Sequence, residues 1–252
     1  MNPLLESVMS RRRLLLGTLT VVAGAVVAAC TGRGQQALTS PSQSASTTAV
    51  ATPSCVVTPT ETEGPYFVDE RLNRADITID PSDASPRPGV PLTLAFTVAR
   101  VGGGGCTALS GAQVDIWHCD AAGIYSDVAA NNSIGKRFLR GYQVTDSSGV
   151  AKFTTIYPGW YRGRAVHIHF KVRTFAGASK TFEFTSQIFF DDTVTDAVFK
   201  VAPYSSRGTR DTRNQNDMVY TSNNNSGALL LALLTPTSAG YAAAFAVGLN
   251  LA

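Results

Sequence analysis

The chain has 252 residues, with 21 Lys and Arg against 18 Asp and Glu and a formal charge of +3. Its length allows a large buried core, and its 44% hydrophobic and 15% charged residues exclude a disordered polyelectrolyte. Residues 55–252 hold 17 basic and 17 acidic residues, so the excess charge lies in the first 54. A neutral domain gives no electrostatic reason to expect a nucleic-acid partner.

Residues 1–30 have the pattern of an export signal. Arg11, Arg12 and Arg13 precede the uncharged apolar run 14–29, which is typical of a twin-arginine signal and short for a spanning helix of about 20 residues. The run ends in VAAC, which resembles a lipoprotein cleavage site with Cys30 as the lipidated residue. We therefore expect an exported, extracytoplasmic lipoprotein that contacts the membrane only through its N-terminal lipid or signal. An uncleaved N-terminal anchor is the alternative.

The next segment separates this signal from a folded domain. Residues 31–54 are rich in Ser, Thr, Ala, Pro and Gln and contain no aromatic residue, which predicts a disordered spacer before a domain at 55–252. Export permits a disulfide, and Cys55, Cys106 and Cys119 allow three pairings. The Cys55–Cys106 pairing is preferred because Cys119 lies within a strand pattern.

The domain shows the alternation of strands and almost no helical periodicity. Many short strands separated by turn residues predict an all-β fold, an antiparallel β-sandwich with a few short helices. A short helix is expected at 192–199, which Asp191 or Asp192 would cap. The uncharged tail 228–252 is expected to form a closing hairpin, because turn residues at 235–240 interrupt it. The predicted strands are 91–98, 114–119, 140–145, 151–156, 166–172, 182–190, 229–234 and 241–251.

The clearest candidates for chemistry are His167 and His169. They alternate within a predicted strand, so both imidazoles point to one face of the sheet. Imidazole is a good ligand for iron, copper and zinc, and two on one face form a pincer. The alternative is an ordinary polar pair on a solvated face. The third histidine, His118, follows a Trp in a strand and is expected to be a packed residue.

Residues around this pair narrow the choice of metal. Tyr161 and Arg164 precede His167 by six and three residues, Tyr125 follows an earlier strand, and Gln187 lies within a later one. No Asp, Glu or Cys stands close by, which makes zinc a poor fit. Two tyrosinates would complete a His₂Tyr₂ set with hard anionic oxygens, which favours ferric iron over softer ions.

Three segments resemble the intradiol ring-cleavage dioxygenases, the family of protocatechuate 3,4-dioxygenase and catechol 1,2-dioxygenase. They are TEGPYF at 62–67, GAQVDIWHCDAAGIY at 111–125 and YPGWYRGRAVHIH at 157–169. The resemblance extends over roughly residues 55–220 and is strongest to the exported, single-domain branch. It implies a prealbumin-like sandwich and a non-haem Fe(III) cofactor. The implied reaction is cleavage of a catechol-type aromatic by O₂ to a cis,cis-muconate-type diacid, a step of aromatic compound catabolism.

The resemblance also implies roles for individual residues. Tyr161 would be the ligand that leaves the metal when substrate binds, and Arg164, with Gln187 beside it, would stabilise the electron-rich substrate. The metal ligands would be Tyr125, Tyr161, His167 and His169, and the segment lining the ring pocket would be Gly64, Pro65 and Tyr66.

Two alternatives remain open at this point. Residues 145–161 also resemble a hairpin of non-catalytic prealbumin-like modules, which favours a binding or display module on the cell surface. The second alternative is a copper or zinc protein that uses the same histidine pair. The spacing from Tyr161 to His167 is shorter than in protocatechuate dioxygenases, and the helical dimerisation region of catechol 1,2-dioxygenases is missing. These departures leave the particular catechol and the oligomeric state undetermined.

Overall fold

The computed structural model describes residues 51 and 55–251, and all of them belong to one compact unit. The expected signal, with Cys30 and nearly all of the expected spacer, lies outside the described residues. Within the described part, no helix is both long enough and apolar enough to cross a membrane.

The described residues form nine strands and a few short helices. The strands are β1 (Pro91–Gly102), β2 (Gly105–Ala108), β3 (Gln113–Trp117), β4 (Arg140–Val144), β5 (Val150–Ile156), β6 (His167–Ala176), β7 (Ser179–Phe189), β8 (Leu233–Pro236) and β9 (Tyr241–Leu249). The helices are α1 (Asp192–Val198) and α2 (Ser222–Asn225), with 3₁₀ turns η1 (Ala129–Asn131), η2 (Tyr204–Arg207), η3 (Asn214–Asn216) and η4 (Ser226–Leu230). Asp191 caps α1 by accepting hydrogen bonds from the amides of Thr193 and Val194.

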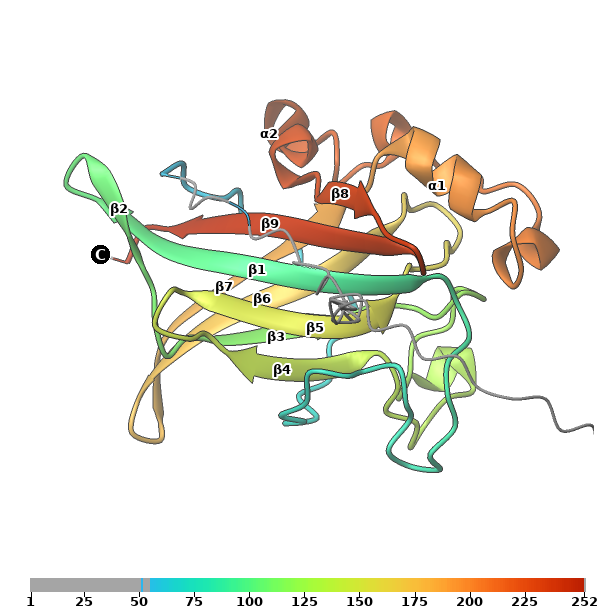
Figure 1. Cartoon of the computed structure of the whole chain (residues 1–252), viewed down its shortest axis with the longest axis horizontal. Coiled ribbons are helices and arrows are strands. Elements are labelled where there is room, and N and C mark those ends of the chain that lie inside the picture. Colours follow the sequence, from blue (N-terminus) through green and yellow to red (C-terminus); the bar gives the residue numbers. More distant parts are fainter. Residues whose placement is uncertain (1–50, 52–54, 252) are drawn as a thin grey trace, which may run out of the picture. The chain divides into compact units, whose positions relative to one another are not determined.

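The strands build two sheets, as the alternation predicts (Figure 1). One sheet has the order β4-β3-β6-β7, with all neighbours antiparallel. The other has the order β2-β1-β9-β8, and β5 pairs with β1 beside β2. Aromatic side chains join the sheets, since Phe170 of β6 packs against Phe96 of β1 and Phe245 of β9, with ring centroids 5.1 and 5.7 Å apart. The β-sandwich prediction is confirmed.

The C-terminal part differs from the expectation in two respects. Strand β9 pairs with β1 in parallel, from Leu92 opposite Tyr241 to Arg100 opposite Leu249, so the sandwich is not antiparallel throughout. The expected strand 229–234 is a strand only from Leu233 onward, because residues 229 and 230 end the 3₁₀ turn η4 and Leu231 forms only an isolated bridge with Phe189. The closing hairpin itself is confirmed, since β8 and β9 pair antiparallel.

Candidate metal centre

The two histidines begin β6 and face away from the space between the sheets. They alternate with Ile168 and Phe170, which are fully buried in the core. His167 and His169 therefore share the outer face of the four-stranded sheet, as the alternation predicts. Their Nε2 atoms lie 3.0 Å apart.

Two tyrosines from separate loops reach the same place. The hydroxyl oxygen of Tyr161 lies 3.1 Å from His167 Nε2. Tyr125, in the loop after β3, has its ring centroid 5.6 Å from that of Tyr161 and 6.1 Å from that of His169. The Tyr125 hydroxyl is buried and has no hydrogen-bond partner of good geometry among the described residues. The structure thus brings together the four predicted ligands.

Burial sets the protonation of these four side chains. It lowers the pKa of His167 to about 3 and also lowers that of His169, so both imidazoles are neutral. His167 Nδ1 lies 2.6 Å from the carbonyl oxygen of Ala165, which assigns the proton to Nδ1 and a lone pair to Nε2. Burial also raises the pKa of Tyr125 and Tyr161, so each phenol keeps its proton unless a cation lies beside it.

This donor set fits a hard, highly charged metal ion. The lone pair on His167 Nε2 points at a second imidazole nitrogen, and the buried Tyr125 hydroxyl beside them has no hydrogen-bond partner of good geometry in the described part of the chain. A cation between them would bind the lone pairs and ionise the phenols. Among residues 51 and 55–251, no group of three or more His, Cys, Asp and Glu could hold a metal, so the tyrosines are needed to complete a site.

His169 is held in place from two sides. The Trp117 ring stacks on its imidazole, with centroids 5.0 Å apart and planes 8° from parallel. Gly64 lies close by, and a Cβ at this position would be 3.2 Å from His169 Cε1. Gly64 belongs to the predicted pocket segment, whereas Trp117 was not among the predicted site residues.

The rest of the pocket segment meets the tyrosines. Tyr66 stacks on Tyr125 with ring centroids 4.5 Å apart, and it meets the Tyr161 ring in a T-shaped contact with centroids 5.9 Å apart. Pro65 is exposed. The structure therefore places Gly64 and Tyr66 against the candidate ligands, with Pro65 at the surface between them.

Arg164 stands beside the centre in a fixed hydrogen-bond frame. Its Nη2 donates to Gln187 Oε1 at 2.6 Å, and its Nε donates to Asp217 Oδ2 at 2.8 Å. Gln187 in turn donates from Nε2 to the carbonyl oxygen of Thr62, at 2.7 Å. The predicted Arg164–Gln187 neighbourhood is present, and Asp217 is an additional member.

Asp217 is a fully buried carboxylate that the sequence did not reveal. Its oxygens accept hydrogen bonds from the amides of Ala165, Val219 and Tyr220, at 2.7, 2.7 and 3.0 Å. Burial alone would raise the pKa of Asp217, but the Arg164 guanidinium and these amides lower it below its usual value. Asp217 lies 53 residues after Arg164, and no motif marks the pair.

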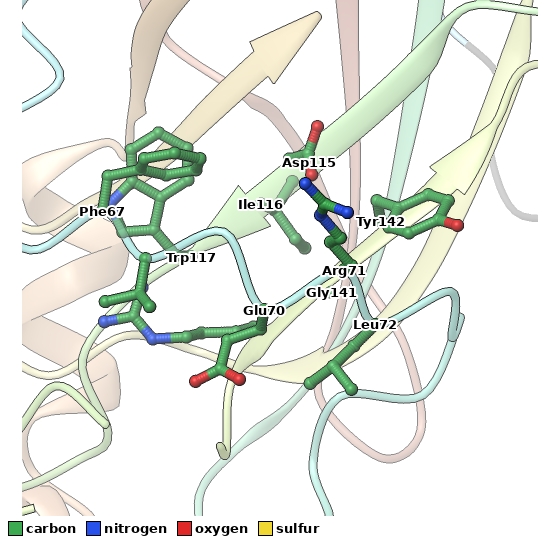
Figure 2. A pocket seen from close by; sticks show the side chains of 11 residues that line it. Phe67, Glu70, Arg71, Leu72, Asp115, Ile116, Trp117, Gly141 and Tyr142 are labelled. Atoms are coloured by element: carbon green, nitrogen blue, oxygen red, sulfur yellow. The ribbon is translucent and has the colours of Figure 1, made fainter. Parts of the chain in front are cut away.

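A small cavity lies next to Trp117 (Figure 2). It has a volume of about 10 Å³ and is bounded by residues 67–72 on one side and by β3 and β4 on the other. This volume holds about one water molecule, so the cavity cannot take an aromatic ring.

The family assignment follows from comparison with known proteins. Residues 62–226, well over half of the chain, match the family model described as Dioxygenase. An intradiol ring-cleavage dioxygenase from Tetranychus urticae has the same fold, with 29% sequence identity and a TM-score of 0.67, over 78% of this chain and 95% of that chain. The chain belongs to the intradiol ring-cleavage dioxygenase family.

Two further dioxygenases are similar to this chain. The dioxygenase domain of a carbohydrate-binding fusion protein from Streptomyces sp. SirexAA-E is 27% identical, with a TM-score of 0.56, over 78% of this chain and all of that domain. Chlorocatechol 1,2-dioxygenase from Pseudomonas putida is 30% identical over 131 residues, which are 44% of this chain and 46% of that enzyme. The match thus spans about half of the length of this relative.

The other residues singled out in the sequence of this dioxygenase-family chain are not among the candidate ligands, although Cys119 packs against Tyr125. His118 is buried, and its ring nitrogens contact Cys119 O at 2.8 Å and Thr155 Oγ1 at 2.7 Å, so it is the packed residue that was expected. Cys55 and Cys106 form a disulfide, which is the preferred pairing. Cys119 is a free, buried thiol whose pKa is raised by burial.

Proposed function

We propose that this chain is a non-haem Fe(III)-dependent enzyme that cleaves a catechol-type aromatic between its two hydroxylated carbons. O₂ would supply both inserted oxygen atoms, and the product would be a cis,cis-muconate-type diacid. The carrying observation is the convergence of His167 and His169 with Tyr125 and Tyr161 on the outer face of one sheet. Ferric iron bound there would supply the Lewis acidity and electron-transfer chemistry for the reaction of a catechol with O₂.

The protein side chains would manage protons and charge. A catechol must lose both hydroxyl protons to become a dianion; the ionised Tyr161 oxygen would accept one of them and a hydroxide from solvent the other. Tyr161 fits this role better than Tyr125, because Tyr125 is 1% exposed and sealed beneath Tyr66, whereas Tyr161 is only partly buried.

Arg164 would hold the negative charge that develops on the substrate. A guanidinium stays protonated throughout the working pH range, and a site largely closed to water strengthens its interaction with an anion. Asp217 and Gln187 already use two of its N–H groups, which fixes the direction of the others.

The proposal has a direct test. The purified chain, reconstituted with ferric iron, is expected to bind one iron, show a tyrosinate-to-iron absorption band in the visible range, and consume O₂ with catechol. Product formation would be assayed with catechol, protocatechuate, hydroxyquinol and chlorinated catechols as substrates. A correctly folded protein that binds no iron would contradict the proposal and favour a non-catalytic binding or display module.

The ligand assignment is tested separately by spectroscopy. Tyr125→Phe and Tyr161→Phe are each expected to shift or weaken the visible band, because each removes one tyrosinate. Tyr142→Phe, on β4 and outside the ligand cluster, is the matched control and should leave the band unchanged. If neither Tyr125→Phe nor Tyr161→Phe alters the band, the assignment is wrong.

We also propose that the protein is exported and anchored through a lipid on Cys30. Residues 1–30 carry the signal pattern, and the Cys55–Cys106 disulfide fits an oxidising compartment. Detergent partitioning and mass spectrometry of the N-terminus test this proposal. The wild type should enter the detergent phase with a modified N-terminal cysteine, and Cys30→Ser should not.

A further inference from the structure

One segment crosses the outer face of the four-stranded sheet and covers the candidate centre. This strap, defined as residues 58–74, is bonded to both edge strands of that sheet. The Glu61 amide donates to Thr185 O of β7 at 3.2 Å, and the Arg74 amide donates to Tyr142 O of β4 at 3.2 Å. The outer face that carries the histidines is therefore a buried interface between sheet and strap.

The middle of the strap lies directly on the ligand cluster. Gly64 abuts His169 and Tyr66 stacks on Tyr125, as described above. The next residue, Phe67, packs against Trp117 with ring centroids 4.8 Å apart, and Figure 2 shows these two rings together. The position of the strap thus fixes one wall of the space around the centre.

Beneath the strap, β6 continues the histidine row with two cations. Lys171 and Arg173 follow in the same alternation and are only 3% and 7% exposed. Lysine is almost never buried to this degree unless it is paired, because removing its charge from water is costly. Arg173 pairs with Asp69 of the strap at 2.9 Å and with Asp115 of β3 at 2.7 Å.

Lys171 makes the ion pair closer to the centre. Its Nζ bonds Glu63 of the strap and lies 3.2 Å from Glu183 of β7. The same ammonium lies 4.2 Å from the centroid of the Phe67 ring, a cation–π contact. Glu63 and Phe67 are the residues on either side of 64–66, so one side chain holds both ends of the predicted pocket segment.

Farther along the strap, some buried polar atoms have no hydrogen-bond partner among the described residues. The cavity in Figure 2 lies between residues 67–72 and the sheet. Three residues lining it carry a buried polar atom without a partner among the described residues, namely Glu70 Oε1, Trp117 Nε1 and Arg140 Nη1. The same stretch is fastened by other groups, since the Tyr142 amide donates to Leu72 O at 2.8 Å and Glu70 pairs with Arg137 at 3.2 Å.

We propose that Lys171 is a positioning residue that fixes residues 64–66 over the metal centre by holding Glu63 and Phe67. The inference rests on the proposed function, because 64–66 then form a wall of the ring pocket. Lys171 acts through the strap and sets how tightly the catechol ring is bound, with little influence on the chemical step.

Hydrogen–deuterium exchange tests the positioning without iron or activity. In Lys171→Met, the Glu61 amide, which bonds the strap to Thr185 O of β7 two residues before Glu63, is expected to exchange at least tenfold faster than in the wild type, and Lys171→Arg should restore most of the protection. The matched control is Lys180→Met, because Lys180 is exposed and pairs with the same Glu183 at 2.6 Å. Unchanged exchange in Lys171→Met would overturn the proposal.

Steady-state kinetics with catechol tests the consequence for binding. Lys171→Met should raise KM at least fivefold and change kcat less than twofold, while Lys180→Met should change neither. A fall in kcat at constant KM would overturn the proposed role. If Lys171→Met does not fold, Glu63→Gln is measured instead, since the Glu63 side chain is 42% exposed and Lys171 keeps Glu183. A wild type without activity would contradict the proposed function, while the exchange result would still decide the positioning.

Discussion

At the scale of single residues, Gly64 has two reasons to be glycine. Its φ is +72°, and a Cβ would press on His169. Gly64→Ala is expected to cost about 1–2 kcal/mol of unfolding free energy for the backbone alone and to weaken iron binding by displacing the imidazole. Gly177→Ala is the control, because Gly177 has φ +61° but open space around it. Urea denaturation should show a similar loss in both variants, and only Gly64→Ala should change the visible band.

Asp217 orients Arg164, so its charge should matter for the reaction. Asp217→Asn keeps the shape of the side chain and removes the ion pair. We expect iron binding to persist and kcat/KM for catechol to fall about 10- to 100-fold as the guanidinium loses its fixed direction. Asp211→Asn, which alters an exposed carboxylate bonded to the Gly163 amide, should have little effect. An unchanged kcat/KM in Asp217→Asn would show that Arg164 does not depend on it.

Sequence reasoning succeeded where the relevant pattern was local. Alternation alone placed His167 and His169 on one face, because a strand has a strict period of two. Tyr125 and Tyr161 were predicted less directly, from the oxygen donors that would complete a metal site with the histidine pair and then from the family resemblance, since nothing in the local pattern of a loop tyrosine distinguishes it. Asp217 was missed because its partner lies far away in sequence and the pairing exists only after folding.

At the scale of elements, two loops meet backbone to backbone to bring the tyrosines together. The loop after β3 carries Tyr125, and the loop after β5 carries Tyr161. The Gly159 amide donates to Asp120 O at 3.2 Å, and a Cβ on Gly159 would lie 2.4 Å from that oxygen. Side chains are therefore excluded from this contact.

Gly159→Ala should force these loops apart. We expect a loss of about 1–3 kcal/mol of unfolding free energy from overpacking, together with weaker iron binding because the two tyrosines separate. Gly102→Ala, at the end of β1 with nothing within 4 Å, should leave both properties unchanged. Denaturation curves and iron content of the purified variants give the comparison, and full iron content in Gly159→Ala would refute the argument.

Strand positions were predictable, but strand partners were less so. Alternation in 91–98 and 241–251 shows that both segments are strands, yet it carries no information on their relative direction. The parallel pairing of β1 and β9 depends on a long connection through the whole domain. Strand β2 was not predicted because it is only four residues long and follows a run of glycines.

At the scale of the whole molecule, all three histidines are buried and neutral. Burial lowers the pKa of His118 to about 4 and of His167 to about 3, and lowers that of His169 as well. Histidines of the unfolded chain take up protons below about pH 6.5, whereas the three buried histidines of the folded protein take up protons only at lower pH. Between these two pH values the unfolded state therefore binds more protons than the folded state. Stability of the metal-free protein should therefore fall as pH is lowered from about 6.5 to about 4.

The slope of stability against pH reports how many histidines contribute. Each contributes about 1.4 kcal/mol per pH unit within its window, so the three together give a slope of about 4 kcal/mol per unit. His118→Gln should reduce the slope by about a third, since it removes one titrating group without touching the candidate ligands. Urea denaturation of the metal-free protein at a series of pH values measures the slope, and the same slope in both proteins would exclude His118 as a contributor.

The Cys55–Cys106 disulfide has a mechanical consequence. It ties the chain to the β1–β2 hairpin before the strap begins, and Thr58 then exchanges hydrogen bonds with Gly248 of β9. Any pull along the chain from the N-terminal side of Cys55 is borne by a covalent bond to the hairpin. The load passes into the sheet that does not carry the histidines, so tension on the chain would not lift the strap from the candidate metal centre.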